Sequence, residues 1–559
     1  MLTRIILAIL IYPDTTKLYN GDSALYEQYA FSMLETGHYL APGYGSASVN
    51  PYADMIRPPG LPLVLASVYG VFGPNAGPWV MIAINTLGIL ALLWLMLTLL
   101  QLMQLQRFWP LLFILVLDPA WMLYSKEILT EPFFTPLLLL SVMLALVGTA
   151  KLTSREYVFG VSGGTSIHPR WLSRFHPLVY FALAGAALGL ATWFKPITLY
   201  APWAAVILLL LVGFLFKRRA VNATDATGSD SDGNHSNEMS DGSFVDVAGD
   251  VRNKSVSEAE DVVHNQGIYA EDDVQNQGIY VEGVVQHQGI YDENASQNVA
   301  ESASEKASSV PRFSSMVLAA VVFLIASQAF IFGWQMRNYV HHQTFAYTSI
   351  AAENMMTGHA AFVLAASERI THLEAQSRIR EMYADRWPDR TEMSFSDQNE
   401  AKLTIAREII GENRGLYAKS ILRGMAITLM DPGRLVYART FRDADVTQIG
   451  FTNIIASEGV LGAVRRVLEE DPLMAGYMVG YMLMLGLFSL LTLYGTWMLL
   501  RKYPLVAATL ICVILYVLVL GGPNGYARFR LYIMPFMLLL SVGAFLITPA
   551  WLKRLNTSR

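Results

Sequence analysis

Apolar residues in this chain fall into blocks of about twenty, separated by polar connections, and this pattern predicts membrane-spanning helices. A helix rises about 1.5 Å per residue, so 18 residues reach about 27 Å, close to the hydrocarbon thickness of a bilayer. Leu2 to Tyr12 is a shorter, tenth candidate that lacks a small-residue cleavage site, so we expect a clipped or interfacial helix rather than a removed signal peptide. The nine longer blocks cover 77–105, 107–124, 127–150, 178–195, 197–216, 313–333, 473–500, 504–521 and 530–550.

Composition supports the same fold class. Hydrophobic residues make up 53% of the 559 residues and charged residues 15%, whereas soluble domains have roughly 25% charged residues. The mean hydropathy is +0.36, which excludes a string of soluble domains. The single cysteine, Cys512, excludes an intramolecular disulfide. We therefore predict an all-α polytopic membrane protein with about 10 transmembrane helices.

Three polar regions interrupt the apolar blocks. Residues 14–76 form a first outer loop within an N-terminal transmembrane module, 1–216, and include a helical stretch from Ala24 to Thr36. After a transmembrane helix at 313–333, residues 334–472 form an extracytoplasmic domain with helical patterns at Glu400–Ile410 and Tyr417–Met430. Residues 473–559 return to transmembrane helices.

The third polar region, 217–312, carries 18 acidic and 7 basic residues. Its balance of −11 is more negative than the net charge of −5 of the whole chain. Polar residues dominate it, so we expect a disordered cytoplasmic insert. An eleven-residue repeat runs through it, at His264 to Tyr269, Gln275 to Tyr280 and Gln286 to Tyr291. Three short acidic repeats cannot bury a face, which leaves two readings: a tolerated loop expansion, or a docking segment for a partner.

Basic residues of the short loops set the orientation, because cytoplasmic loops are enriched in Lys and Arg. With the N-terminus inside, the cytoplasmic connections are the more basic ones, and the predicted outer ends of the spans hold most of the charged residues near the membrane. Such groups are costly there and indicate function. They are Asp22, Glu27, Arg57, Asp118, Glu127, Glu131, Lys195, Arg337, Arg528 and Arg530.

Carboxylates and cations gathered at one membrane face suit group transfer from a lipid phosphate. Arg and Lys bind phosphate and stabilise it as a leaving group, and a carboxylate deprotonates a hydroxyl or amine. The residues show no phosphate-cradling glycine loop, nucleotide-binding motif or metal-ligand cysteine set.

Several ordered motifs resemble the GT-C fold glycosyltransferases, in particular the branch of protein O-mannosyltransferases and the lipid A aminoarabinose transferase (family 39-like). The resemblance covers most of the chain apart from 217–312 and the middle of the outer domain. It rests on Asp22 with Tyr26, Leu34-Glu-Thr-Gly-His-Tyr39, Arg57-Pro-Pro-Gly-Leu-Pro62, Asp118-Pro119 through Thr130-Glu131, Gly189 through Lys195-Pro196, Trp334-Gln-Met-Arg-Asn-Tyr339 with Asn354, and Tyr526-Ala-Arg-Phe-Arg530.

The resemblance implies an inverting enzyme that takes a sugar from a polyprenyl-phosphate donor, with a lipid, glycan or protein acceptor. It implies Asp22 as general base and Glu131 as a supporting acid. Arg57 stands where many members have Lys, and Asp118 stands where relatives tend to have Asn. The residues implied to bind the donor phosphate are Arg57, Lys195, Arg337, Arg528 and Arg530, and those in supporting positions are Tyr26, Glu27, Asn338 and Asn354.

Structural readings compete with these roles. Asp22 could be the N-cap of a helix starting near Ser23, and Glu127 an acid at a helix N-terminus. Asp118 fits a hydrogen-bonded structural acid better than a catalytic one. Arg528 and Arg530 could anchor the last helix by snorkelling to the headgroups.

No metal site is assigned. His341-His342 has no nearby Asp/His pattern and reads as a surface feature, although a divalent metal stays open as a cofactor. We expect a multi-pass protein of the inner (plasma) membrane, with an extracytoplasmic site and no nucleic-acid partner. The rival functions are a transporter or lipid flippase, which explains many spans equally well, and an envelope glycan polymerase or ligase.

Overall fold

The computed structural model describes residues 21–40, 53–124, 126–153, 158–159, 175–228, 313–441 and 451–546. Those residues form helices and connections without a strand. The chain divides into two compact units, Met1–Lys217 with Pro311–Arg559, and Arg218–Val310. The short N-terminal candidate, Leu2 to Tyr12, and the repeats of the insert lie outside the described residues.

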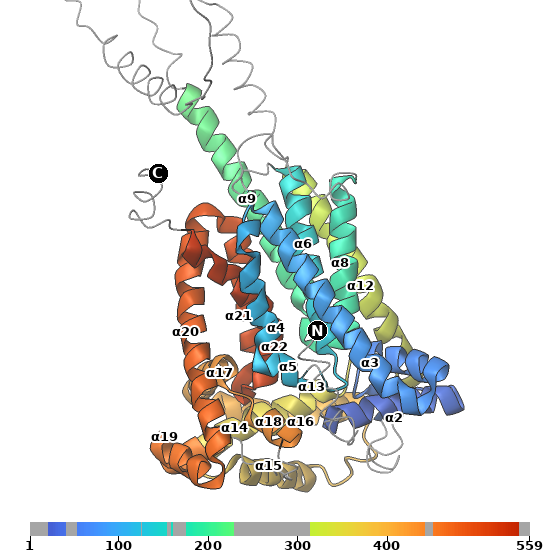
Figure 1. Cartoon of the computed structure of the whole chain (residues 1–559). Coiled ribbons are helices and arrows are strands. Elements are labelled where there is room, and N and C mark those ends of the chain that lie inside the picture. Colours follow the sequence, from blue (N-terminus) through green and yellow to red (C-terminus); the bar gives the residue numbers. More distant parts are fainter. Residues whose placement is uncertain are drawn as a thin grey trace, which may run out of the picture. The chain divides into compact units, whose positions relative to one another are not determined.

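Among the residues that the structure describes, eight helical segments are long and apolar enough to cross a membrane, which agrees with a polytopic α-helical membrane protein. Long helices such as α3, α6, α8, α12, α20 and α21 run alongside one another (Figure 1). The eight segments are Gly60–Leu102 (α3), Glu131–Leu152 (α6), Pro177–Phe194 (α8), Pro196–Leu215 in η5 and α9, Phe313–His342 (α12), Pro472–Lys502 (α20), Pro504–Asn524 in α21 and η7, and Ala527–Phe545 in α22 and η8.

The apolar block at 107–124 does not form one continuous helix, because the chain breaks there into Gln106–Leu112 (η3), Phe113–Leu117 (α4) and Pro119–Tyr124 (α5). Asp118 adopts an extended ψ of 122°, as expected for a residue that precedes proline. Its carboxylate accepts the Trp121 N–H at 2.9 Å and a bond from the Tyr481 hydroxyl at 2.5 Å. Asp118 is therefore buried and hydrogen-bonded, as the structural reading expects.

Two other boundaries differ from the prediction. The helix α3 begins at Gly60, inside the expected outer loop, and bends at Gly73, whose φ of 77° favours glycine. The helix α9 (Ala201–Gly228) continues beyond Lys217, the expected start of the disordered insert.

Close helix packing holds α8 against α12. A Cβ added at Gly185 would lie 2.2 Å from the Phe323 carbonyl oxygen, and one added at Gly189 would lie 2.5 Å from that of Ser327. Two small residues four apart on one helix face are typical of membrane helix pairs. The helix α6 packs on the other side of α8, so these three helices form one layer (Figure 1).

Short helices gather at the end of the bundle where α6 begins and α8 ends (Figure 1). The predicted helical stretches at Ala24–Thr36, Glu400–Ile410 and Tyr417–Met430 are confirmed, because they lie within α2, α16 and α17. The elements of this region are Gly21–Thr36 (α2), Ala53–Met55 (η2), Ile350–Glu353 (α13), Asn354–Ala360 (η6, a π-helix), Ala361–Glu368 (α14), His372–Arg386 (α15), Phe395–Glu412 (α16), Arg414–Met430 (α17), Arg434–Phe441 (α18) and Phe451–Glu470 (α19).

Candidate functional site

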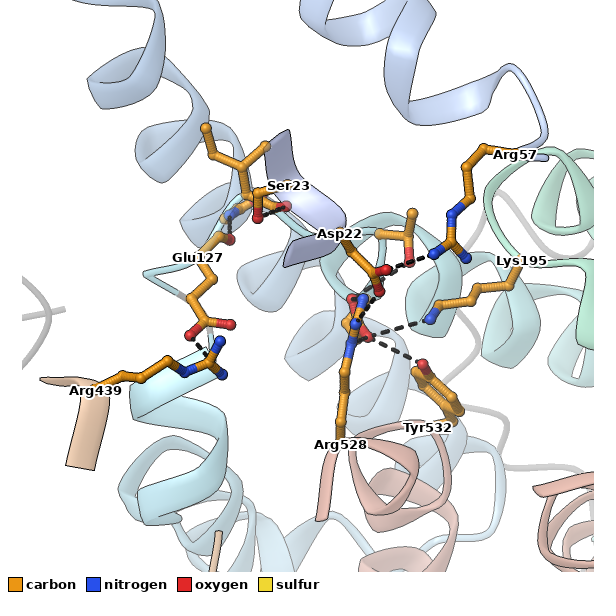
Figure 2. Close-up of polar contacts among 12 residues, drawn as sticks. Asp22, Ser23, Arg57, Glu127, Lys195, Arg439, Arg528 and Tyr532 are labelled. Atoms are coloured by element: carbon orange, nitrogen blue, oxygen red, sulfur yellow. Dashed lines mark hydrogen bonds and ion pairs between the residues drawn. The ribbon is translucent and has the colours of Figure 1, made fainter. Parts of the chain in front are cut away.

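Five charged side chains from five separate segments meet at this end of the bundle, and Figure 2 labels four of them, Asp22, Arg57, Lys195 and Arg528. Asp22 lies in the first turn of α2, and Arg57 lies just before α3. Glu131 is the first residue of α6, Lys195 lies between α8 and η5 (Pro196–Thr198), and Arg528 lies in the first turn of α22 (Ala527–Ser541). We call these five residues the charged cluster.

Arg528 is the centre of the charged cluster. Its Nη1 lies 2.6 Å from Asp22 Oδ2, and its Nε donates to Glu131. Arg57 Nη2 donates to the other oxygen of Asp22, at 2.5 Å, and Lys195 Nζ lies 3.5 Å from Glu131 Oε1. The Glu131 side chain is 2% exposed and that of Asp22 is 29% exposed, so Asp22 is the carboxylate that an incoming molecule can reach.

The charged cluster holds two carboxylates and three cations. Burial by itself raises the pKa of Asp22, but Arg57, Arg528 and Lys195 beside it hold the pKa well below its usual range. Burial and the neighbouring Arg528 lower the pKa of Lys195 to about 8, against the opposing pull of Glu131. Asp22 is therefore ionised at neutral pH, whereas Lys195 begins to lose its proton at a pH slightly above neutral.

Proline and glycine residues help to position Lys195 and Arg57 in the charged cluster. Lys195 is extended, with φ −143° and ψ 117°, because Pro196 disfavours a helical residue before it. A Cβ at Gly60 would lie 2.7 Å from the Trp193 carbonyl oxygen, so only glycine lets the start of α3 approach the end of α8 this closely. The Arg57-Pro58-Pro59-Gly60 motif thereby brings Arg57 close to Lys195.

Tyr532 is a member of the site that the sequence analysis missed. Its hydroxyl donates to Glu131 Oε1 at 3.0 Å, and Lys195 Nζ lies 5.0 Å from the centre of its ring. Tyr532 follows Arg528 by four residues on α22, a spacing that places both on one helix face and could have indicated it. Tyr26, a predicted supporting residue, lies under the Arg57 guanidinium at 5.7 Å.

Arg337 pairs with a different acid. Its Nη2 lies 2.6 Å from Asp54 Oδ2, and its Nη1 donates to Asn338 at 3.1 Å. Asn338 in turn donates to the carbonyl of Ala346 at 2.8 Å, which fixes the chain after α12. The structure places Arg337 and Asn338 in this contact with the first loop rather than in the charged cluster.

Arg530 is held in a separate buried network. Its Nη1 donates to the carbonyls of Thr428 and Asp431, at 3.2 and 2.7 Å, and its Nη2 lies 3.0 Å from the hydroxyl oxygen of Tyr481. Arg530 is 1% exposed and Arg528 is 7% exposed, so the snorkelling reading is wrong for both. Arg530 fastens α22 to the end of α17.

The remaining predicted residues lie elsewhere. Glu27 accepts a hydrogen bond from the Tyr69 hydroxyl, and Asn354 is exposed at the start of η6. Glu127 is fully buried before α6 begins, with Arg439 at 3.4 Å, so the reading as a helix N-terminal acid is wrong (Figure 2). Asp22 lies within α2, one residue after its start at Gly21, rather than at an N-cap next to Ser23.

His342 is not a free surface histidine, because its Nε2 lies 2.8 Å from Asp54 Oδ2. The reading of His341-His342 as a surface feature is therefore wrong for His342. Within the described ranges no three His, Cys, Asp or Glu side chains come together as a metal site.

An apolar cavity of about 330 Å³ lies between α6, α9 and α21, and aliphatic side chains form most of its lining. Thr198 and Tyr516 also line it. The Thr198 hydroxyl donates to the Lys195 carbonyl at 3.1 Å, and the Tyr516 hydroxyl donates to the Ile197 carbonyl at 2.7 Å. One part of the cavity therefore lies against the η5 turn that follows Lys195.

In comparisons with known proteins, no protein-family model, curated protein or solved structure matches this chain. The charged cluster and the cavity are therefore interpreted from their own chemistry.

Proposed function

We propose that this protein is an integral membrane glycosyltransferase that moves a sugar from a polyprenyl-phosphate donor to an acceptor at the outer face of the cytoplasmic membrane. The observation that carries the proposal is the charged cluster, in which two carboxylates and three cations from five segments meet at one end of the apolar helices. A carboxylate suited to act as a base and cations suited to bind phosphate therefore lie together, which supports a group-transfer reaction.

The reaction needs a base for the acceptor. Asp22 is ionised and is the more accessible of the two acids, so it takes the proton of an acceptor hydroxyl or amine. The acceptor atom then bonds to the anomeric carbon from the side opposite the phosphate. The anomeric C–O bond breaks, and its electron pair leaves with the lipid phosphate.

The departing phosphate gains one negative charge. Arg57, Arg528 and Lys195 are fixed cations at this site, and fixed cations stabilise charge where it develops. Glu131, bonded by Arg528, Lys195 and Tyr532, holds two of these groups in place rather than exchanging protons with the acceptor.

The cavity supports a lipid-linked donor. It is apolar, it lies among candidate membrane helices, and it abuts the turn that follows Lys195. A donor with its phosphate at the cations and its first isoprene units in the cavity matches this order of polar and apolar surfaces.

The proposal is tested with purified protein in proteoliposomes and radiolabelled sugars on two donor classes, decaprenyl phosphate and nucleoside diphosphate. We expect release of sugar from the decaprenyl-phosphate donors alone. Release only from the nucleotide donors overturns the donor assignment. If a well-folded protein releases no sugar but moves labelled decaprenyl-phosphate sugar across the bilayer, the protein is a flippase and the enzyme proposal fails.

A further inference from the structure

Asp22 engages two cations of the charged cluster at once. One carboxylate oxygen accepts a hydrogen bond from Arg57 at 2.5 Å, and the other accepts one from Arg528 at 2.6 Å. Arginines bind phosphate in the same way, with guanidinium groups that donate to separate oxygens of one anion. Asp22 therefore has the position and hydrogen bonds that a phosphate at this site requires.

We propose that Asp22 is an internal competitor for its own anion site, and that a singly charged lipid phosphodiester takes over Arg57 and Arg528 and thereby releases Asp22 as the base. This inference rests on the proposed function and deepens it, because it assigns both the charge of the substrate and the event that activates the base.

The two acids differ in their ability to exchange partners. Glu131 is 2% exposed and is bonded by Arg528 and Tyr532 on one face of α22 and by Lys195 at the end of α8. Asp22 is 29% exposed and lies in the first turn of α2. The more exposed Asp22 carboxylate can turn toward solvent when it is replaced, whereas replacing Glu131 leaves a buried charge without its partners.

The charges of the cluster favour a monoanion. Asp22 and Glu131 carry two negative charges, and Arg57, Lys195 and Arg528 carry three positive charges. One further negative charge makes the site neutral, and a phosphodiester has one. After transfer Asp22 holds the acceptor proton and the lipid phosphate monoester is a dianion, so the site is neutral again.

Displacement changes the basicity of Asp22. In the present arrangement the cations outweigh burial and hold its pKa well below the usual range, which makes it a weak base. The groups that act on it are Arg57 before α3, Arg528 on α22, Lys195 after α8 and Tyr26 on α2, and Glu131 on α6 shares Arg528 with it. Once the phosphate neutralises the cations, the ionised carboxylate loses its main stabilisation and its pKa rises. The base thus becomes effective only with donor bound.

The test is equilibrium binding of a phosphodiester probe, farnesyl methyl phosphate, to the full-length protein in nanodiscs. Asp22→Asn removes the competing charge while keeping the shape, so we expect it to bind the probe at least about tenfold more tightly than wild type, equivalent to about 1.4 kcal/mol. The matched control is Asp54→Asn, which removes an aspartate paired to Arg337 at the same 2.6 Å and should leave probe affinity within about twofold.

A second measurement uses the wild type alone and covers the case in which Asp22→Asn fails to fold. Calorimetry at about pH 4.5 in buffers of different ionisation enthalpy reports protons taken up with the probe, and we expect uptake because the pKa of Asp22 rises. Equal or weaker binding by Asp22→Asn, or no proton uptake by wild type, overturns the exchange while leaving the proposed enzyme in place. Failure of both proteins to bind the probe overturns the phosphate site itself, and with it the proposed function.

Discussion

Asp22 and Arg528 are 506 residues apart in the chain and yet lie 2.6 Å apart in the structure. Arg528 also donates to Glu131, so one guanidinium joins the start of α2 to the start of α6. The site therefore depends on the whole helical bundle rather than on any one segment.

Arg528→Gln should be strongly destabilising. It removes the guanidinium partner of the buried Glu131 carboxylate, and loss of one partner of a buried pair costs about 3–5 kcal/mol. Thermal unfolding in detergent measures the effect. Arg465→Gln, which removes an 83% exposed partner of Glu469, is the control and should change stability by less than about 0.5 kcal/mol. Similar losses in the two variants contradict the central position of Arg528.

Tyr532→Phe should lower transfer about tenfold with little change in fold. The variant removes the hydroxyl that donates to Glu131 and keeps the ring beneath Lys195, and a hydrogen bond to a charged group is worth about 1.5–3 kcal/mol. Initial rates in proteoliposomes provide the measurement. Tyr494→Phe, on the exposed side of α20, should behave as wild type; equal rates in all three proteins exclude a positioning role for Tyr532.

Gly60→Ala should reduce both stability and transfer. The added methyl group would lie 2.7 Å from the Trp193 carbonyl oxygen, which is backbone and cannot move aside cheaply, so the start of α3 must shift, and this disturbs the pairing of the nearby Arg57 with Asp22. Gly480→Ala, in α20 with no neighbour within 4 Å of the added carbon, serves as the control and should be neutral or stabilising. A fully active Gly60→Ala protein contradicts the packing argument.

The pH dependence follows from Asp22 and Lys195. The pKa of Asp22 is held below its usual range in the free protein, so kcat/KM should stay level as the pH falls from 7 to about 5. Lys195 has a pKa of about 8, so kcat/KM should fall above that pH as the cluster loses a positive charge. The pH profile of kcat reports the enzyme–donor complex. If donor binding raises the pKa of Asp22, kcat should begin to decrease on the acid side at a higher pH than kcat/KM does. Coincident acid limbs contradict the release of the base by substrate.

The sequence was sufficient to select several members of the charged cluster, because charges next to apolar spans are rare and costly. Helix register explains where it failed. Arg528 and Arg530 are two residues apart and were assigned one role, but side chains two apart on a helix point in different directions. Arg528 accordingly meets Asp22, whereas Arg530 meets the carbonyls at the end of α17.

Long-range pairing explains the other differences. Asp54 lies in the first loop and gave no signal of its own, yet it binds both Arg337 and His342 at the end of α12. The apolar run at 107–124 has the length of one continuous helix, but Asp118 followed by proline is extended and interrupts that helix. Hydropathy reports burial and length, and it does not report which polar group meets which.

The most direct test of the central claim compares sugar release from a radiolabelled decaprenyl-phosphate donor by wild type, Asp22→Asn and Asp54→Asn in proteoliposomes. Loss of a positioned base slows a reaction about 100- to 10,000-fold, so Asp22→Asn should fall by that factor while Asp54→Asn retains most of its activity. Release by Asp22→Asn at the wild-type rate, with all three proteins folded, contradicts the claim that Asp22 is the base of a glycosyl transfer.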